Sequence, residues 1–236
     1  MIAIGYAVIA VMCVAVLASA FKLWRTHRNA ITLLMLIPLL FLWLDNFAIA
    51  TGRLVGEGPL LTGMTYLRFF LHWATLPLLF IVAGALARRA GFTWAQNRYV
   101  MALFCITAVV LIAEDVPYIF KVDFYPACYG DTLRYTSNVA ATQVCDPANP
   151  PPPGFSPAPI AAIGVNVVLM IIGFAMWWKD KFPWLALSCV FMFACAASGA
   201  NPNFYWGQIL GNLGEPIFNA GLIAAGYKYA ARPAKA

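Results

Sequence analysis

The stretch ITLLMLIPLLFLWLDNFAIATGRLVGEGPL, residues 31 to 60, joins a long apolar run to a group of polar side chains. The apolar part has the length of a membrane span, because crossing a hydrocarbon core of about 30 Å takes about 20 helical residues. Four strongly polar residues then follow within 13 positions: Asp45, Asn46, Arg53 and Glu57. Burying such groups in lipid is costly, so they either mark where the chain reaches water or form a polar site.

The composition of the whole chain is that of a membrane protein. Of its 236 residues, 63% are hydrophobic and 10% are charged, and the mean hydropathy is +0.78. Backbone polar groups inside lipid must be paired within the protein, so an apolar chain of this kind is expected to be helical. We therefore expect an all-α polytopic membrane protein with one transmembrane domain, residues 1–236. Seven spans fit: 2–21, 30–50, 64–86, 99–119, 159–178, 184–200 and 208–228.

The charged residues predict the orientation of these spans. The segments 22–29, 87–98, 179–183 and 229–236 are short and basic, and cytoplasmic loops concentrate Lys and Arg. This positive-inside pattern places the N-terminus outside and the C-terminus in the cytoplasm of a multi-pass protein in a cell membrane, such as a bacterial inner membrane. Eleven of the 15 basic residues belong to these segments or their boundary: Lys22, Arg25, Arg28, Arg88, Arg89, Arg98, Lys179, Lys181, Lys228, Arg232 and Lys235.

Two glycine-rich segments resemble each other. GRLVGEGP (52–59) follows the second span, and GQILGNLGEP (207–216) begins the seventh. Parallel repeats of this kind occur in membrane proteins, and two three-helix repeats joined by the fourth span would give a 3+1+3 arrangement. Chance similarity between glycine-rich turns explains the pattern equally well.

The one long loop, residues 120–158, is predicted to lie outside the membrane. It contains Cys128 and Cys145 and ends in a proline-rich stretch that should be extended. Cysteines on the oxidising side of a membrane pair readily, so we expect a Cys128–Cys145 disulfide. The other cysteines lie within spans and are expected to act as small apolar residues.

Ionisable residues of four spans fall at nearly one depth. Counting from the outer helix ends at about 1.5 Å per residue, they lie roughly 6 to 10 Å below the outer boundary. Arg68 and His72 are four residues apart and share one helix face. Ionisable groups inside spans tend to face the bundle and pair, so Arg68 should bridge Asp45 or Glu215. The candidate ligand-binding residues are Asp45, Asn46, Arg68, His72, Glu114, Asp115 and Glu215.

A purely structural ion-pair network would explain these residues as well as a pocket would. Glu114 and Asp115 are adjacent, so at most one of them points directly into the bundle. His72 extends the polar surface inward, whereas no acid, base or second histidine lies deeper in any span. This pattern favours a pocket open toward the outside or the outer leaflet over a continuous ion pathway.

Several classes of protein are excluded. Retinal would need a lysine near the middle of the last span, where the chain has only Lys228 at the cytoplasmic end. With only His27 and His72, a bis-histidine haem or a histidine-rich metal centre cannot form within one chain, although His72 alone could ligate a haem or chlorophyll. No metal site is predicted, no basic patch interleaved with aromatics indicates nucleic-acid binding, and the sequence identifies no cofactor.

The sequence therefore leads to a hypothesis with three alternatives. The leading hypothesis is a seven-helix bundle whose outer half binds a lipid headgroup or an amphiphilic small molecule. Arg68 would hold an anionic group, with Asp45 and Glu215 orienting it and His72 at the floor. The alternatives are a membrane-embedded enzyme using His72 with Glu114 or Asp45 on a lipid or isoprenoid, a non-catalytic subunit of a complex, and a small-solute carrier. Membrane lipids are the expected partners, and a homo-oligomer remains open.

Overall fold

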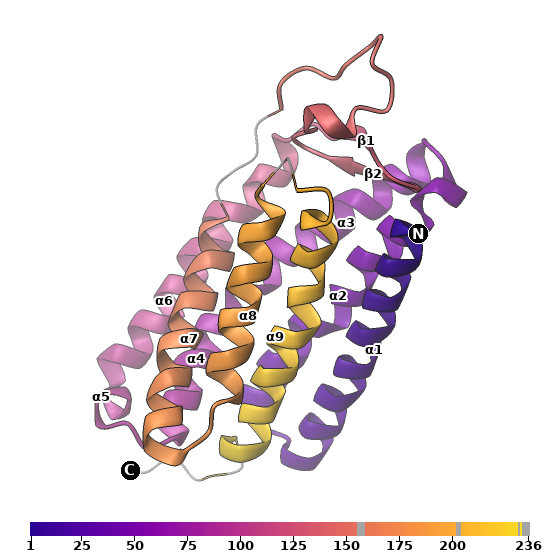
Figure 1. Cartoon of the computed structure of the whole chain (residues 1–236). Helices are drawn as coiled ribbons and strands as arrows, with labels where there is room; N and C mark the ends of the chain where they lie inside the picture. The colour runs from indigo at the N-terminus through magenta and orange to yellow at the C-terminus, as the bar shows by residue number, and fades with distance from the viewer. Residues whose placement is uncertain (155–158, 202–203, 231, 233–236) are drawn as a thin grey trace.

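The computed structural model of the chain shows a bundle of long, roughly parallel helices with a small hairpin at one end (Figure 1). It describes residues 1–154, 159–201, 204–230 and 232. Part of the predicted loop, residues 155–158, and Lys235 of the predicted basic tail lie outside these residues. The all-α prediction is confirmed for the bundle, and the hairpin is an addition to it.

The described part of the chain contains five helical segments that are long and apolar enough to cross a membrane. This is the character of a multi-pass membrane protein, as the composition predicted. Single helices α1 (Ile2–His27), α2 (Ala30–Val55) and α7 (Ile160–Asp180) form three of the segments. The other two are Pro59–Arg89, which contains α3 (Pro59–Thr75) and α4 (Leu78–Arg89), and Arg98–Phe120, which contains α6 (Arg98–Asp115) and the 3₁₀ helix η1 (Val116–Phe120).

The last two helices of the bundle differ from these five. Helix α8 (Trp184–Gly199) is apolar but has only 16 residues, about 24 Å at 1.5 Å per residue. Helix α9 (Gly207–Tyr229) has 23 residues, but polar side chains interrupt its apolar sequence: Gln208, Asn212, Glu215 and Asn219. Both helices lie alongside the others in the bundle (Figure 1).

The predicted helix over residues 64–86 is interrupted in the structure. Pro77 separates α3 from α4, because proline has no N–H with which to continue the helical hydrogen bonds. At this point hydrogen bonds join residues three apart instead of four: Leu79 N donates to Leu76 O and Phe80 N donates to Pro77 O, each at 3.0 Å. Both halves of this segment contact α2 and α6, but α3 packs mainly against α2, whereas α4 also packs against α7.

The helices form a ring around the core. Helix α1 packs between α2 and α9, α8 packs between α9 and α7, and α4 contacts both α2 and α7. Helix α6 lies outside this ring against α3 and α4, with apolar side chains such as Leu103 and Val109 exposed. The buried centre contains mainly leucine and alanine, including Leu79, Ala83 and Leu169.

A two-stranded hairpin covers one end of the bundle, which we call the hairpin end. Strands β1 (Tyr125–Tyr129) and β2 (Thr132–Thr136) pair antiparallel around a two-residue turn in which Gly130 has a φ of 58°. The predicted Cys128–Cys145 disulfide is present and ties β1 to the loop that follows the short helix η2 (Ala141–Gln143). The sequence analysis did not predict the hairpin.

We call the opposite end of the bundle the basic end. Lys179 Nζ donates to the carbonyls of Ala90 and Gly91 at 2.7 and 2.9 Å, just beyond the C-terminus of α4. The short helix α5 (Thr93–Gln96) joins α4 to α6 at the same end. Helix α1 begins at the hairpin end and α9 ends at the basic end (Figure 1). Cations here bind helix C-termini, where orphan carbonyls and the helix dipole favour positive charge.

Candidate functional site

An ion pair between α2 and α3 lies at the centre of the candidate site. Arg68 Nη1 is 3.2 Å from Asp45 Oδ1, and the Arg68 side chain is 7% exposed. Of the two pairings that the sequence left open for Arg68, the structure contains the one with Asp45. Arg68 Nη2 also donates to the carbonyl of Tyr135 in β2 at 3.4 Å. One guanidinium thus connects α2, α3 and the hairpin.

A group of amides extends this polar cluster toward α1 and α9. Asn212 Nδ2 donates to Asp45 Oδ2 at 3.3 Å and to Asn46 Oδ1 at 3.1 Å. Asn46 is fully buried and its Nδ2 lies 3.9 Å from Cys13 Sγ. Asn46 therefore faces the bundle, as the sequence predicted, and it helps to orient Asp45 through Asn212.

Glu215 of α9 belongs to the same cluster. Its carboxylate lies within hydrogen-bonding range of the Asn46 side chain, and Asp45 is close enough to interact with it electrostatically. Two buried polar atoms of the cluster have no hydrogen-bond partner among the described residues: Glu215 Oε2, an acceptor when ionised, and Arg68 Nε, a donor. Buried polar atoms are usually paired, so these two atoms leave the cluster incompletely hydrogen-bonded.

Two cavities adjoin this cluster, and we call the one with the greater volume the larger cavity. It has a volume of about 410 Å³ and is enclosed by α2, α3, α4, α7, α8 and α9. Asp45, Arg68, His72 and Glu215 form its charged or titratable surface. Its remaining walls are mostly apolar, and they include Leu42, Leu71, Leu79, Val165, Met192 and Phe218. Asn166 and Asn219 are further polar groups in the lining.

A second cavity, of about 260 Å³, lies between α3, α6 and α7. Asp45, Arg68 and His72 line both cavities, so they form the boundary between the two spaces. The lining of the second cavity also includes Asp115 and Ser137, and the aromatic side chains Phe69 and Trp73. The ion pair is therefore accessible from two sides, one mainly apolar and one partly polar.

His72 keeps considerable exposed surface even though it lies within the bundle. The histidine lines both cavities, so part of its side chain faces them. Its side chain is thus available to a bound molecule. Among the described residues, no group of three or more His, Cys, Asp or Glu side chains is arranged to hold a metal ion.

The structure separates the other candidates. Asp115 lines the second cavity, whereas Glu114 is exposed and lines neither cavity. This agrees with the expectation that adjacent residues cannot both point into the bundle. Arg53, in the last turn of α2, and Glu57, in the connection that follows, are both exposed at the hairpin end. Gly56 and Gly58 in this connection have φ values of 75° and 150°. Asn46 lines neither cavity and acts on the site through its hydrogen bonds.

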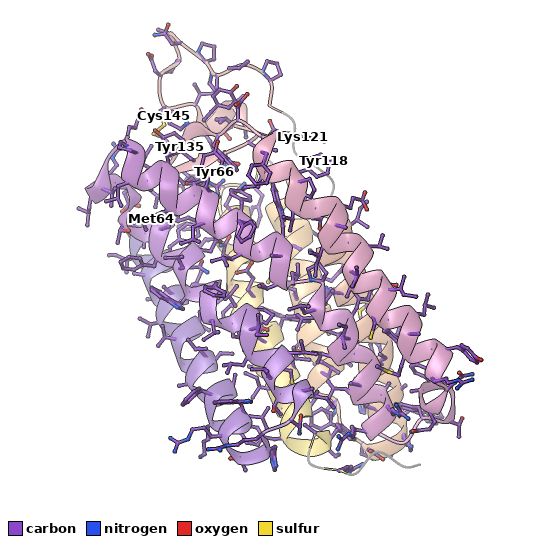
Figure 2. All side chains as sticks on the ribbon, turned by 180° about the vertical axis from the view of Figure 1, so that it is seen from behind. Met64, Tyr66, Tyr118, Lys121, Tyr135 and Cys145 are labelled. Atoms are coloured by element: carbon purple, nitrogen blue, oxygen red, sulfur yellow. A yellow bond between two sulfur atoms is a disulfide. The ribbon has the colours of Figure 1, made fainter. Side chains whose placement is uncertain are left out.

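The hairpin covers the site and was the main element that the sequence analysis missed. Gly52 of α2 allows the backbone of β2 to approach closely, since a Cβ at this position would lie 1.8 Å from the Leu133 carbonyl oxygen. Figure 2 labels Tyr66 of α3, Tyr135 of β2 and Cys145 of the disulfide together at this end. The signal was available: two strand-like runs, YPACY and TLRYT, flank the two-residue turn Gly130–Asp131.

Arg134 of β2 also points toward the bundle. Its Nη2 donates to Gln143 Oε1 at 3.0 Å and to Gln208 Oε1 of α9 at 2.6 Å. Burial lowers the pKa of the Arg134 guanidinium, and the nearby Tyr6 and Asp45 oppose this shift. The hairpin is thereby attached to α9 as well as to α2 and α3, so it closes the bundle directly above the polar cluster.

No known protein family matches the chain, and no curated protein is similar to it in sequence.

Proposed function

We propose that the chain is a seven-span membrane protein that binds a lipid headgroup or similar amphiphile in the hairpin-end half of its bundle. In this proposal α8 and α9 cross the membrane with the five longer segments, the hairpin lies outside, and the basic end faces the cytoplasm, as in a bacterial inner membrane. The basic residues at one end and the disulfide at the other support this orientation.

One observation carries the proposed binding function: two residues in the lining of a mostly apolar cavity, Arg68 and Glu215, each have a buried polar atom without a hydrogen-bond partner, Nε and Oε2. Small-molecule sites typically have volumes of about 300 to 1,000 Å³, mainly apolar walls and a few convergent polar groups. The larger cavity, at about 410 Å³, has these properties. A molecule with a polar end and an apolar body suits it better than a fully polar solute.

The two atoms also indicate the chemistry of the polar end. Asp45 already pairs with the Arg68 guanidinium, so a ligand would complete the coordination of Arg68 rather than replace its partner. Arg68 Nε needs an acceptor, and an ionised Glu215 Oε2 needs a donor. A phospholipid headgroup with a phosphate beside an ammonium or hydroxyl group provides both. Arg68 then holds the anionic group, as the sequence led us to expect, while Glu215 binds the donor instead of orienting Arg68.

Thermal unfolding of the purified chain in detergent tests this function. Phosphatidylethanolamine should raise Tm, whereas phosphatidylcholine with the same acyl chains should raise it much less, because choline has no N–H or O–H donor. At 100 times Kd, binding to the folded state alone stabilises it by about 2.7 kcal/mol. Arg68→Ala should remove the difference between the two lipids.

Arg53→Ala is the matched control, since Arg53 is exposed at the same end of the bundle. Equal stabilisation by both lipids in the wild type, unchanged in Arg68→Ala, would refute the proposed site.

A small-solute carrier is the second candidate, and the interruption of the third span favours it. The break at Pro77 adjoins the larger cavity, whose lining includes Thr75, Leu76 and Leu79 on both sides of the break. Discontinuous helices beside a central cavity are typical of transporters. Counterflow of labelled solutes in proteoliposomes tests this candidate, and uptake by the wild type that Arg68→Ala abolishes would support it over simple lipid binding.

A further inference from the structure

The interface between α7 and α8 changes along its length. Near the basic end the two backbones are in close contact: a Cβ on Gly173 would lie 2.6 Å from the backbone nitrogen of Ala186 and 2.9 Å from its Cα. Farther along, Asn166 Nδ2 donates to the carbonyl of Cys189 at 3.3 Å. The Gly173 contact holds the helices together in the part of the bundle away from the hairpin, whereas the Asn166 hydrogen bond lies beside the larger cavity.

Toward the hairpin end, the larger cavity lies between the same two helices. Ile163 of α7 and Phe193 of α8 both line it, yet they are 51% and 48% exposed. Three small residues of α8 share this double character of lining the cavity and being exposed: Ala196, Ala197 and Ala200. Residues 193, 196, 197 and 200 follow helical spacing and form one stripe of α8. The cavity therefore opens to the side of the bundle, between α7 and α8.

The surroundings of this opening differ from those of the second cavity. The residues named at the opening are all apolar, and in a membrane-spanning bundle they face hydrocarbon. The second cavity includes Asp115 and Ser137, and the hairpin lies over the cluster through the Arg68–Tyr135 hydrogen bond. Water and ions have no favourable route through a stripe of alanine, isoleucine and phenylalanine, whereas an acyl chain does.

We infer that the occupant of the larger cavity is a lipid resident in the outer leaflet, with its headgroup at Arg68 and Glu215 and one acyl chain passing between α7 and α8. This inference rests on the proposed function and specifies the source of the ligand: it comes from the bilayer and not from water. The alanines at the opening leave space for the acyl chain of the lipid. The close contact between α7 and α8 at Gly173 limits how far the opening extends toward the basic end.

The test uses the full chain in nanodiscs that contain a phosphatidylethanolamine with a photoreactive diazirine in its acyl chain. We expect labelling of residues 160–166 and 193–200 that excess unlabelled phosphatidylethanolamine suppresses. Labelling of the exposed outer face of α6, around Ile106, reports ordinary lipid contact and should not be suppressed selectively. Ala197→Trp fills the opening and should abolish the suppressible labelling.

Ala194→Trp is the matched control, because Ala194 is exposed on the same helix and does not line the cavity. If Ala197→Trp keeps the suppressible labelling and the headgroup-dependent Tm shift while Arg68→Ala loses the Tm shift, the pocket stands and the lateral opening is refuted. If Arg68→Ala also keeps the Tm shift, both the lateral opening and the proposed function are refuted. Both tryptophan variants should retain the Tm of the wild type without lipid, which shows that they fold.

Discussion

The two ends of the bundle use charge in opposite ways. At the basic end, Lys179 and Lys228 donate to backbone carbonyls at 2.7 to 3.1 Å. At the hairpin end, Asp45, Arg68 and Glu215 surround a cavity, and two of their polar atoms lack a partner among the described residues. The first arrangement stabilises helix ends in a packed region. The second leaves two buried polar atoms unpaired in residues that line a cavity, so we expect function at the hairpin end.

The close packing of α7 and α8 at Gly173 tests this comparison, and disrupting it should have the largest effect on stability. Gly173→Leu would force side-chain atoms into the backbone of α8, which cannot move without separating the helices. We expect a loss of about 3 kcal/mol in the free energy of unfolding, at the upper end of typical overpacking costs. Gly63→Leu is the control, since a Cβ on Gly63 meets nothing within 4 Å. Unfolding in detergent measures both, and equal losses would contradict the assigned packing.

Removal of Arg68, the cation of the polar cluster, should have the next largest effect on stability. Arg68→Ala breaks the pair with Asp45 and the bond to Tyr135, and we expect a loss of about 2 kcal/mol. The loss should be smaller than for a fully buried pair, because the Asp45 side chain is 30% exposed. Arg53→Ala should change stability by less than about 0.5 kcal/mol. The ion pair would be energetically unimportant if the two variants unfold alike.

Single cations at the basic end should contribute less. Lys179→Met removes the donor to Ala90 and Gly91, and we expect a loss of about 1 kcal/mol. Lys22→Met provides a comparison at an exposed position of α1. Chemical unfolding of the two variants should show the difference, and a larger loss in Lys22→Met would overturn the role given to helix C-termini.

The smallest effect on stability should come from the unpartnered carboxylate. Glu215→Gln keeps the shape of the side chain and removes a buried charge, so Tm without lipid should stay the same or rise. Binding of phosphatidylethanolamine should weaken, because the amide attracts the ammonium group less strongly. Glu114→Gln, at an exposed position, should alter neither quantity. A clear drop in Tm for Glu215→Gln would mean that its carboxylate serves the fold.

The general character of the fold could be predicted because it depends on composition and on apolar segment length. The disulfide was equally accessible, since only Cys128 and Cys145 lie in the long loop. The break at Pro77 was missed because the apolar run continues through it without a change in hydropathy. The differences of the last two helices were readable in the sequence, since α8 is short and polar side chains lower the hydropathy of α9.

The candidate site could be predicted in part, because depth along a helix is readable from a sequence and direction around it is less so. Counting residues placed Asp45, Arg68 and Glu215 at nearly one level and His72 about one turn deeper, and these four line the same cavity. The choice between Glu114 and Asp115 needed the rotation of α6 about its axis. The proposed lateral opening depends on how α7 and α8 pack along their length, which a single sequence does not encode in any local pattern.

The central claim is that the cavity at the hairpin end holds a lipid. Native mass spectrometry of the purified chain tests this claim most directly. After mild delipidation, the wild type should retain one phospholipid whose headgroup carries an N–H or O–H donor, and Arg68→Ala should retain none under the same conditions. Retention of no phospholipid by the wild type, or of the same mixture of lipids by both proteins, would contradict the claim.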